Sequence, residues 1–533
     1  MTIRIRRVKA FNTAGPCVPG RDYMLDPLAR LPNALRLAEQ GKYFVVHAPR
    51  QTGKTTALRA LAHELNGTGR YAAVRVSCER AAGVEDLASA QEAILEGMHY
   101  AAEDQGLTTD CRPPGRWPEA SPLGMVFAAL RAWARKSSRP LVLLFDEIDA
   151  LAGPALVSVL RQLRDGATSI DTPFPHSVVL CGMRNVRDYK AASGGDPTRL
   201  GTQSPFNISV ESMRIGDFGL EEVAELYGQH TEATGQAFTG YAIQRAFEAS
   251  QGQPWLLNAL ARDIIEEMSI PVEQPITDSL MEQAVERLIV QRATHLDSLV
   301  ARLSEPRVRR IIEPMIIGGT APGDVVYNDD LAYVRDLGLI ARTRTVQIAN
   351  PIYQETVVRA LTQLLEINIQ ADPQAFLLPD GRLDIARLLN EFTAWWKANG
   401  EIIDTDRTYH EAACHLIFMA FLQRVVNGGG HIDREYALGK KRLDLTIRKP
   451  YTDETGQPAI QWSAFELKVR SDVSGDQIKP GLEQLDAYLG RLGLDTGTLL
   501  VFDRRTDAPP ITARTGIDTA TSPSGRTVTL IHA

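Results

Sequence analysis

The chain has 533 residues, of which 44% are hydrophobic and 23% charged, and its formal net charge is −7. This length suits about three or four domains, and the composition excludes extensive disorder. The mild negative charge is not typical of a nucleic-acid-binding protein, although a local basic groove would be compatible with it.

The five cysteines are scattered and never occur in CxxC spacing, which argues against a disulfide framework and against a zinc site. No apolar run reaches the ~20 residues of a membrane span. The start MTIRIRRVKAFN lacks the apolar core of a signal peptide. We therefore expect a soluble, cytoplasmic protein with no membrane partner.

The first motif is a phosphate loop. The segment KYFVVHAPRQTGKTTALRALAHELN is typical of a buried strand, a loop and a helix. Against the pattern GxxxxGK(S/T) it keeps Gly53, Lys54 and Thr55, whereas Ala48 replaces the first glycine. Backbone N–H groups at the helix start would cradle phosphates, Lys54 would reach the β and γ phosphates, and Thr55 would ligate Mg²⁺. Thr56 completes the residues predicted to bind the nucleotide here.

The second motif is an acidic pair at the end of an apolar strand. In RPLVLLFDEIDAL, residues 141–145 are all apolar, which is typical of a strand buried on both faces of a parallel sheet. Carboxylates at the end of such a strand lie beside the phosphate loop. Asp146 would hold Mg²⁺ through its hydration shell, and Glu147 would polarise the attacking water. The alternative is a helix N-cap, a role that Asp149 could also fill.

Three more strands are predicted around these motifs, at residues 71–78, 176–185 and 205–212. This order of motifs and strands resembles the additional-strand ATPases of the AAA+ and STAND type. The resemblance implies that Arg184 or Asn185, which follow a strand, would sense the γ-phosphate. The alternative for these two residues is an ordinary loop.

A helical stretch follows at about 217–290. Its segment Gly252-Gln253-Pro254 resembles the GxP turn that positions the lid of STAND-like ATPases. A simple helix start with Pro254 in the first position is an equally good interpretation.

Residues from about 295 to 363 predict helices, two short strands and a closing helix, the pattern of a winged helix. Its recognition-type helix would lie around residues 331–337. This helix would carry Asp329, Asp330 and Asp336 against a single arginine, Arg335, which suits protein packing better than a DNA major groove. We therefore expect a structural or regulatory module.

The last third predicts a helix, three strands, a second helix and a fourth strand. If its second and third strands form a hairpin, Asp444 lies beside Glu466 and Lys468 on one face. Two carboxylates and an ammonium suit metal-assisted phosphodiester hydrolysis, because the acids hold Mg²⁺ and the lysine orients the nucleophile. The alternative for a charged strand face is plain exposure to solvent. The four predicted strands cover residues 431–438, 441–449, 459–470 and 497–503.

This region resembles the PD-(D/E)XK nuclease superfamily, with Asp444 as the motif aspartate and Glu466-Leu467-Lys468 as the ExK motif. Leu443 replaces the usual proline before the aspartate. The resemblance implies a metal site in which Leu467 joins the two acids, and a catalytic role for Lys468.

Two further features resemble the RecB-type branch of that superfamily. Glu411 on the first helix would be an additional metal ligand, and Gln484 with Tyr488 would form the QxxxY motif. The spacing i, i+4 lets Gln484 and Tyr488 face the same site, with a solvated helix face as the alternative. Basic residues nearby could hold the phosphate backbone or belong to a solvated edge strand; they are Lys440, Lys441, Arg442, Arg448 and Lys449.

Taken whole, the chain resembles AAA-like ATPases that carry a C-terminal PD-(D/E)XK domain. The expected class is a multidomain α/β protein with an ATPase core, a helical lid, a winged-helix module and a restriction-endonuclease-like domain. The expected boundaries are 1–215, 216–292, 293–368 and 369–533. The resemblance implies ATP, Mg²⁺ or Mn²⁺ at both sites, a nucleic-acid partner, with DNA favoured, and a homo-oligomer.

Three functions are consistent with these residues. The first is an ATP-controlled, Mg²⁺-dependent deoxyribonuclease. The second is a STAND-like switch or DNA-binding regulator whose nuclease fold does not cleave. The third has RNA or branched DNA as the substrate, which the sequence does not distinguish from the first.

Overall fold

A computed structural model describes most of the chain. It divides into two compact units, of which the first comprises residues 1–293, 332–342 and 349–352 and the second the remainder. No described helix has the length and apolar character needed to cross a bilayer. The described residues are 9–151, 153–169, 171–183, 211–291, 294–316, 329–343, 346–366, 373–404, 417–422, 431–438, 441–453, 456–470, 475–503, 505 and 507–533.

The first unit contains a five-stranded parallel sheet with strand order β2-β3-β4-β1-β5. The predicted parallel α/β fold is thus confirmed. In space β4 lies between the phosphate-loop strand β1 and the acidic strand β3, and β2 lies at the edge. The predicted strand 205–212 is described only from Glu211 onward. The strands are β1 (Tyr43–His47), β2 (Ala72–Ser77), β3 (Leu141–Asp146), β4 (Ser177–Gly182) and β5 (Glu211–Arg214).

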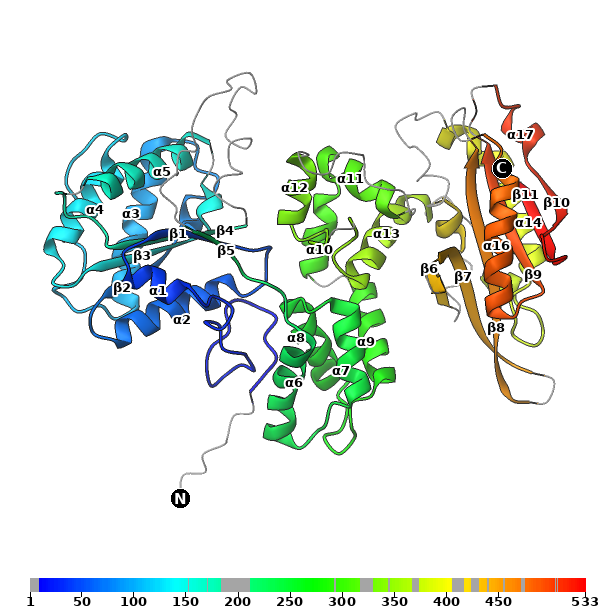
Figure 1. Ribbon diagram of the computed structural model, residues 1–533, viewed down its shortest axis with the longest axis horizontal. Coiled ribbons are helices and arrows are strands. Elements are labelled where there is room, and N and C mark those ends of the chain that lie inside the picture. Colours follow the sequence, from blue (N-terminus) through cyan, green and yellow to red (C-terminus); the bar gives the residue numbers. More distant parts are fainter. Residues whose placement is uncertain are drawn as a thin grey trace. The chain divides into compact units, whose positions relative to one another are not determined.

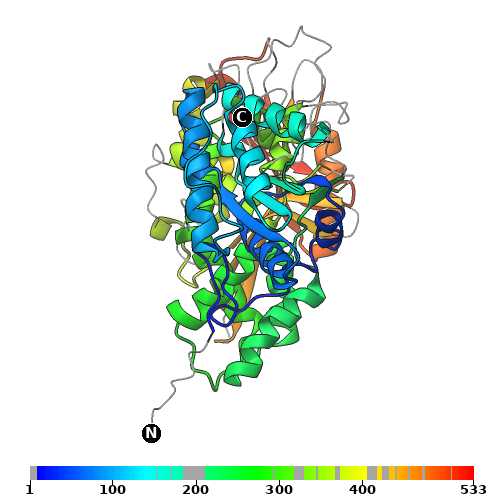
Figure 2. The same cartoon turned by 90° about the vertical axis from the view of Figure 1, so that its left-hand side faces the viewer.

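Helices cover both faces of this sheet (Figure 1). Alternate strand residues enter two hydrophobic cores, one beneath α3, α4 and α5 and the other beneath α1 and α2. Figure 2 turns these blue-to-cyan elements toward the viewer. Burial on both faces explains why β1, β3 and β4 are buried at every position. The helices are α1 (Ala34–Glu39), α2 (Lys54–Gly67), α3 (Leu87–Asp104), α4 (Met125–Lys136) and α5 (Gly153–Thr168).

The helical stretch predicted after the sheet is present. Within it, Gln253 caps α8 by accepting the Leu256 N–H (2.6 Å), with Pro254 in the first turn. Gly252 has a left-handed backbone, and a methyl there would lie 1.9 Å from the carbonyl oxygen of Phe218. The turn is therefore both a helix start and a close packing contact. The helices are α6 (Leu220–Thr234), α7 (Gly240–Ser250), α8 (Pro254–Arg262), a π-helical turn (Asp263–Glu267) and α9 (Asp278–Gln291).

Four helices occupy the region where a winged helix is predicted. The wing itself stays a prediction, because Arg344 and Thr345 lie outside the described residues. Asp336 accepts from Arg342 (2.7 Å) and is buried, in keeping with the expectation that the acidic residues serve packing. The helices are α10 (Thr294–Arg302), α11 (Pro306–Ile316), α12 (Asp329–Asp336) and α13 (Pro351–Glu366).

The second unit contains a six-stranded mixed sheet with order β10-β11-β9-β8-β7-β6. β8, β9 and β11 are parallel, and the other pairs are antiparallel. The segment DTATSPSGRT (518–527), where no strand is predicted, supplies the end of β10, the turn and the first residue of β11. The strands are β6 (His431–Leu438), β7 (Lys441–Thr452), β8 (Pro458–Arg470), β9 (Thr496–Asp503), β10 (Gly516–Thr521) and β11 (Thr527–His532).

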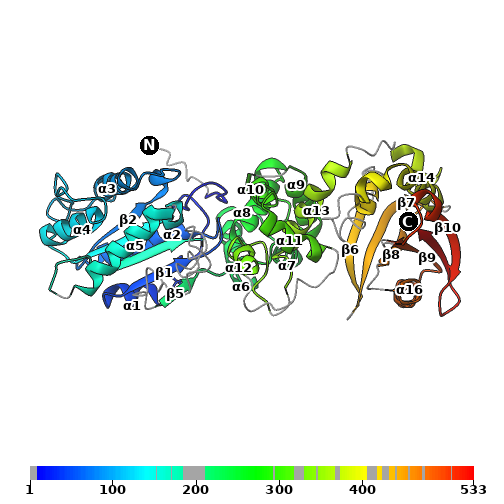
Figure 3. The same ribbon diagram turned by 90° about the horizontal axis from the view of Figure 1, so that it is seen from above.

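Helices also cover both faces of the second sheet (Figure 3). α16 (Ile478–Leu492) packs its Leu485 and Leu489 against one face. On the other face, Phe392 and Trp396 of α14 (Ile385–Asp404) contact Phe502 of β9, with ring centroids 6.5 and 5.3 Å away. Consecutive β8 residues therefore point alternately toward α16 and toward this aromatic cluster.

Candidate functional site

The phosphate loop joins β1 to α2 and contains two left-handed residues, Gln51 (φ +59°) and Gly53 (φ +88°). A methyl at Gly53 would lie 3.3 Å from Nη1 of Arg30, so glycine suits both the backbone and the space. Ala48, which replaces the first motif glycine, is buried and has no positive φ. Alanine at that position therefore causes no backbone strain.

Lys54 begins α2 and folds back over the loop. Its Nζ donates to the carbonyl oxygens of Ala48 (2.8 Å) and Pro49 (2.6 Å). Burial lowers the pKa of Lys54, and the carboxylates at the end of β3 oppose that shift. Thr55 follows in the same turn, whereas the Thr56 hydroxyl accepts the backbone N–H of Cys17 (3.1 Å). Thr56 thus anchors the N-terminal segment.

Asp146 ends β3 and is buried. Its Oδ2 accepts from Nη1 of Arg75 (3.1 Å), whereas its buried Oδ1 has no hydrogen-bond partner among the described residues. A buried carboxylate oxygen without a partner is unfavourable unless a ligand satisfies it. Oxygen ligands of this kind suit Mg²⁺, so the site fits the metal that the motif predicts.

Glu147 has a left-handed backbone (φ +56°), which is uncommon for a residue with a side chain. Its Oε2 accepts from the Ser77 hydroxyl (3.2 Å). Burial is the main cause that raises the pKa of Glu147, and the negative charge of Asp146 raises this pKa further. A carboxylate with a raised pKa is suited to accepting a proton from water.

The N-cap alternative for this acidic segment is wrong. Glu147 precedes a short 3₁₀ turn but makes no side-chain cap. Asp149 instead accepts the backbone N–H of Met183 (3.3 Å), which joins the ends of β3 and β4. The predicted sensor residues Arg184 and Asn185 lie outside the described residues.

Residues 18–179 match the family model described as the AAA ATPase domain. This part of the chain is an AAA ATPase domain. No curated protein matches the chain. The match supports ATP hydrolysis by this domain, with ATP and Mg²⁺ as ligands. The phosphate loop, Lys54 and the β3 carboxylates are the residues predicted to form its site.

The matching solved structures include three proteins of low sequence identity. A Walker-type ATPase of Pyrococcus abyssi has 14% identity and a TM-score of 0.47, covering 65% of this chain and 99% of that chain. The RuvB Holliday junction branch migration motor of Thermotoga maritima has 15% identity and a TM-score of 0.33, covering 60% and 90%. Domain III of the replication initiation protein DnaA from Thermotoga maritima has 11% identity and a TM-score of 0.31, covering 50% and 93%.

Sequence reasoning missed two arginines of the AAA ATPase domain. Arg30 donates to the carbonyl oxygens of Thr52 (2.8 Å) in the phosphate loop and Gly216 before α6, and stacks over Phe218 (4.6 Å). Burial lowers the pKa of Arg30 to about 10. Arg75, the partner of Asp146, had a signal in the sequence, because it is a charged residue within an apolar strand.

The second candidate site lies on the face of β8 that α16 covers. Glu466 is completely buried, and Nζ of Lys468 donates to its Oε1 (2.5 Å). The same Nζ donates to Oε1 of Gln484 on α16 (3.1 Å). Tyr488, one turn further, is buried in the hydrophobic core beneath α16. Neither α16 residue belongs to a solvated helix face.

The remaining predicted metal ligands of this site are described only in part. β7 pairs antiparallel with β8, and Leu445 lies opposite Phe465. The next residue on each strand is Asp444 and Glu466, so their backbones are neighbours if the register continues. The side chain of Asp444 and all of Glu411 lie outside the described part of the chain.

Leu467 alternates with Glu466 and Lys468, and its buried side chain points away from α16. Because a leucine side chain has no donor atom, only the backbone carbonyl of Leu467 could bind a metal ion. Among the described side chains, no three His, Cys, Asp or Glu residues form a metal-binding group. The metal site of this region stays a prediction.

Proposed function

We propose that the chain is an ATP-controlled, Mg²⁺-dependent nuclease that cleaves nucleic acid, with DNA as the expected substrate. The AAA ATPase domain would control cleavage at a PD-(D/E)XK-type site that contains Asp444, Glu466 and Lys468. ATP binding or hydrolysis would act by assembling subunits or by closing the lid.

The position of Lys468 carries the proposal. Its ammonium group lies between the buried carboxylate of Glu466 and the amide of Gln484. Removing a carboxylate from water costs several kcal/mol unless it is paired and hydrogen bonded. A strand face that merely meets solvent would not require this arrangement, whereas a metal-dependent hydrolase would.

Each residue has a distinct role in the proposed reaction. A bound Mg²⁺ would polarise the phosphate and lower the pKa of its water. Glu466 and Asp444 would hold the metal ion through carboxylate oxygens, with Glu411 and the Leu467 carbonyl as further ligands. Lys468 would orient the nucleophile or offset the charge that develops on the phosphate. Gln484 would keep the Lys468 ammonium at the site.

The wider organisation belongs to the same proposal. The chain would comprise an ATPase core (1–215), a lid (216–292), a winged-helix module (293–368) and a nuclease domain (369–533). It would act as a cytoplasmic homo-oligomer. Arg184 or Asn185 would sense the γ-phosphate, and Tyr488 would support Gln484 from the core beneath α16.

The test is cleavage of plasmid, linear duplex and single-stranded DNA by the full chain with Mg²⁺, with and without ATP. Lys468→Ala should abolish cleavage while ATP hydrolysis continues. Lys54→Ala should abolish ATP hydrolysis and make cleavage insensitive to ATP. Lys479→Ala is the matched control, because Lys479 is an exposed lysine in the first turn of α16.

Absence of cleavage from every DNA substrate, with ATP hydrolysis intact, would refute the deoxyribonuclease. Cleavage of matched RNA or junction substrates would then indicate a nuclease with a different substrate. No cleavage of these substrates would favour the alternative function, a STAND-like switch. Loss of both activities in Lys468→Ala, with Lys479→Ala unaffected, would contradict two separate sites.

A further inference from the structure

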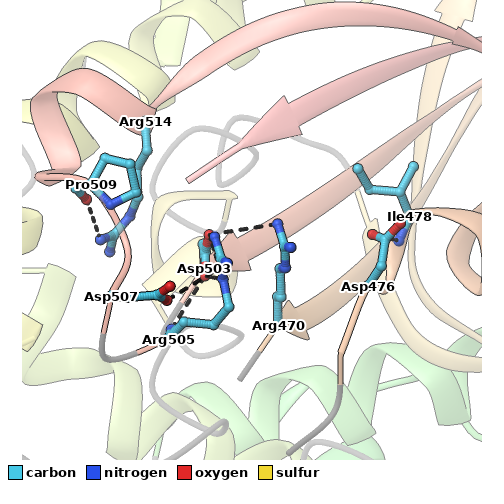
Figure 4. Close-up of polar contacts among 8 residues, drawn as sticks. All are labelled: Arg470, Asp476, Ile478, Asp503, Arg505, Asp507, Pro509 and Arg514. Atoms are coloured by element: carbon cyan, nitrogen blue, oxygen red, sulfur yellow. Dashed lines mark hydrogen bonds and ion pairs between the residues drawn. The ribbon is translucent and has the colours of Figure 1, made fainter. Parts of the chain in front are cut away.

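A cluster of charged side chains lies beyond the carboxyl ends of β8 and β9 (Figure 4). Arg470 ends β8 and Asp503 ends β9, and the two are direct partners in the parallel ladder. Arg505 follows Asp503 after one residue. Ligands of sheets with parallel strands commonly bind beyond the carboxyl ends of those strands.

Arg505 and Asp503 form a bidentate ion pair. Nε of Arg505 donates to Oδ1 (2.9 Å), and Nη2 donates to Oδ2 (2.7 Å). Hydrogen bonds from Arg505 lower the pKa of Asp503, so this carboxylate is ionised at neutral pH. Asp507 is 3.6 Å from Arg505 but its side chain is 79% exposed, which makes its contribution small.

Arg470 shares the same carboxylate at a longer distance. Its Nη1 lies 3.9 Å from Oδ2 of Asp503, which is too far for a hydrogen bond. Its Nε is buried and has no hydrogen-bond partner among the described residues. Two guanidinium groups thus face one partly buried carboxylate, so Arg470, Arg505 and Asp503 together have one positive charge in excess, which the exposed Asp507 offsets only weakly. An anion bound beside Arg470 would satisfy both the charge and the buried N–H.

The cluster lies on the same face as the proposed nuclease site. Glu466, Lys468 and Arg470 alternate along β8, so all three side chains point toward the α16 side. Two residues along a strand span about 7 Å. A chain of phosphates that meets Lys468 can therefore continue onto Arg470.

We propose that Arg470 and Arg505 form a phosphate-binding site that holds the nucleic-acid backbone next to the phosphodiester cleaved at Lys468. This inference rests on the proposed nuclease function and adds a substrate-binding surface to it. Asp503 positions Arg505 and does not touch the nucleic acid. Phosphate-binding side chains of this kind set the position of a substrate and do not read its sequence.

The experiment measures DNA binding by the full chain with Lys468→Ala, so that no substrate is cleaved. Fluorescence anisotropy of labelled duplex and single-stranded DNA over a series of salt concentrations gives the slope of log K against log salt. For each phosphate that the arginine neutralises, Arg470→Gln and Arg505→Gln should reduce this slope by about 0.9 on duplex DNA or about 0.7 on single strands.

Arg526→Gln is the matched control. Arg526 donates to Asp486 (2.9 Å), and these side chains are 28% and 15% exposed, close to the 34% and 16% of Arg470 and Asp503. It precedes Thr527, the first residue of β11, at the opposite end of the same parallel strands. The change of charge is identical, so its slope should equal that of the parent.

Unchanged slopes in both Arg470→Gln and Arg505→Gln would overturn the inference. An equal reduction in Arg526→Gln would also overturn it, because the effect would then be one of net charge. Should Arg505→Gln fail to fold, Arg470→Gln decides alone, because it leaves the Asp503–Arg505 pair intact. If the unsubstituted chain cleaves DNA while both slopes stay unchanged, only this inference fails; if it neither cleaves nor binds DNA, the proposed function fails with it.

Discussion

Gly252→Ala should destabilise the helical segment α6–α9 through one specific contact. The methyl would lie 1.9 Å from the carbonyl oxygen of Phe218, and two further backbone atoms of Phe218 lie within 3.0 Å. Phe218 cannot move away freely, because its N–H donates to the carbonyl oxygen of Gly252 (2.8 Å). We expect the left-handed backbone to cost about 1–2 kcal/mol and the overpacking about 1–3 kcal/mol, a total of about 2–5 kcal/mol.

Gly235→Ala is the control that separates these two terms. Gly235 has φ +87°, close to the +79° of Gly252, and follows the helix α6, but no atom lies within 4 Å of its added methyl. Replacing glycine by alanine lowers the conformational entropy of the unfolded chain by the same amount at both positions, so this effect cancels when the two variants are compared. Gly235→Ala should therefore cost only about 1–2 kcal/mol.

The assay is urea denaturation of the full chain, combined with hydrogen exchange of the segment 246–262. Because Phe218 supports Arg30, which holds the phosphate loop at Thr52, Gly252→Ala should also raise the KM for ATP. Equal loss of stability in Gly252→Ala and Gly235→Ala would refute the reasoning, because the contact with Phe218 would then have no energetic effect.

Three other predictions concern charged side chains. Glu147→Gln should reduce ATP hydrolysis about 100- to 10,000-fold while ATP binding, measured by calorimetry, is retained. Because the pKa of Glu147 is raised, the hydrolysis rate of the unsubstituted chain at saturating ATP should fall on acidification at a higher pH than for an ordinary glutamate. Asp503 has a lowered pKa in the folded protein, so its stabilisation is present above the ordinary carboxyl pKa and is lost as the pH falls through the lowered value. Asp503→Asn should therefore reduce stability in urea denaturation at neutral pH and less so in acid.

The strands and the helix around the predicted nucleotide site could be predicted because their signals are local in the sequence. An apolar strand followed by a loop with GKT, and another that leads into Asp146-Glu147, specify both the elements and the end of the sheet where they meet. The same reasoning did not explain Ala48, since only the backbone angles show that the left-handed positions are Gln51 and Gly53. The substitution is acceptable for a reason that no motif contains.

The β10–β11 hairpin was not predicted because its first strand, β10, has few apolar residues. Strand β10 pairs only with β11 and lies at the sheet edge, so most of its side chains need no burial. Its pairing depends on β11, which joins the sheet through a parallel contact with β9. A strand that depends on a distant partner leaves little local signal.

The arginines that sequence reasoning missed share one property: their partners are distant in sequence or are backbone atoms. Arg30 binds carbonyl groups, which have no sequence signature, and Arg75 meets Asp146 only because β2 and β3 are neighbours. Arg470 meets Asp503 for the same reason, through the register of β8 and β9. The role of a charged residue at a strand end cannot be predicted until the register shows which residue lies opposite. For Arg470 that residue is Asp503, which already binds Arg505. This shared carboxylate is what distinguishes Arg470 from an ordinary exposed arginine.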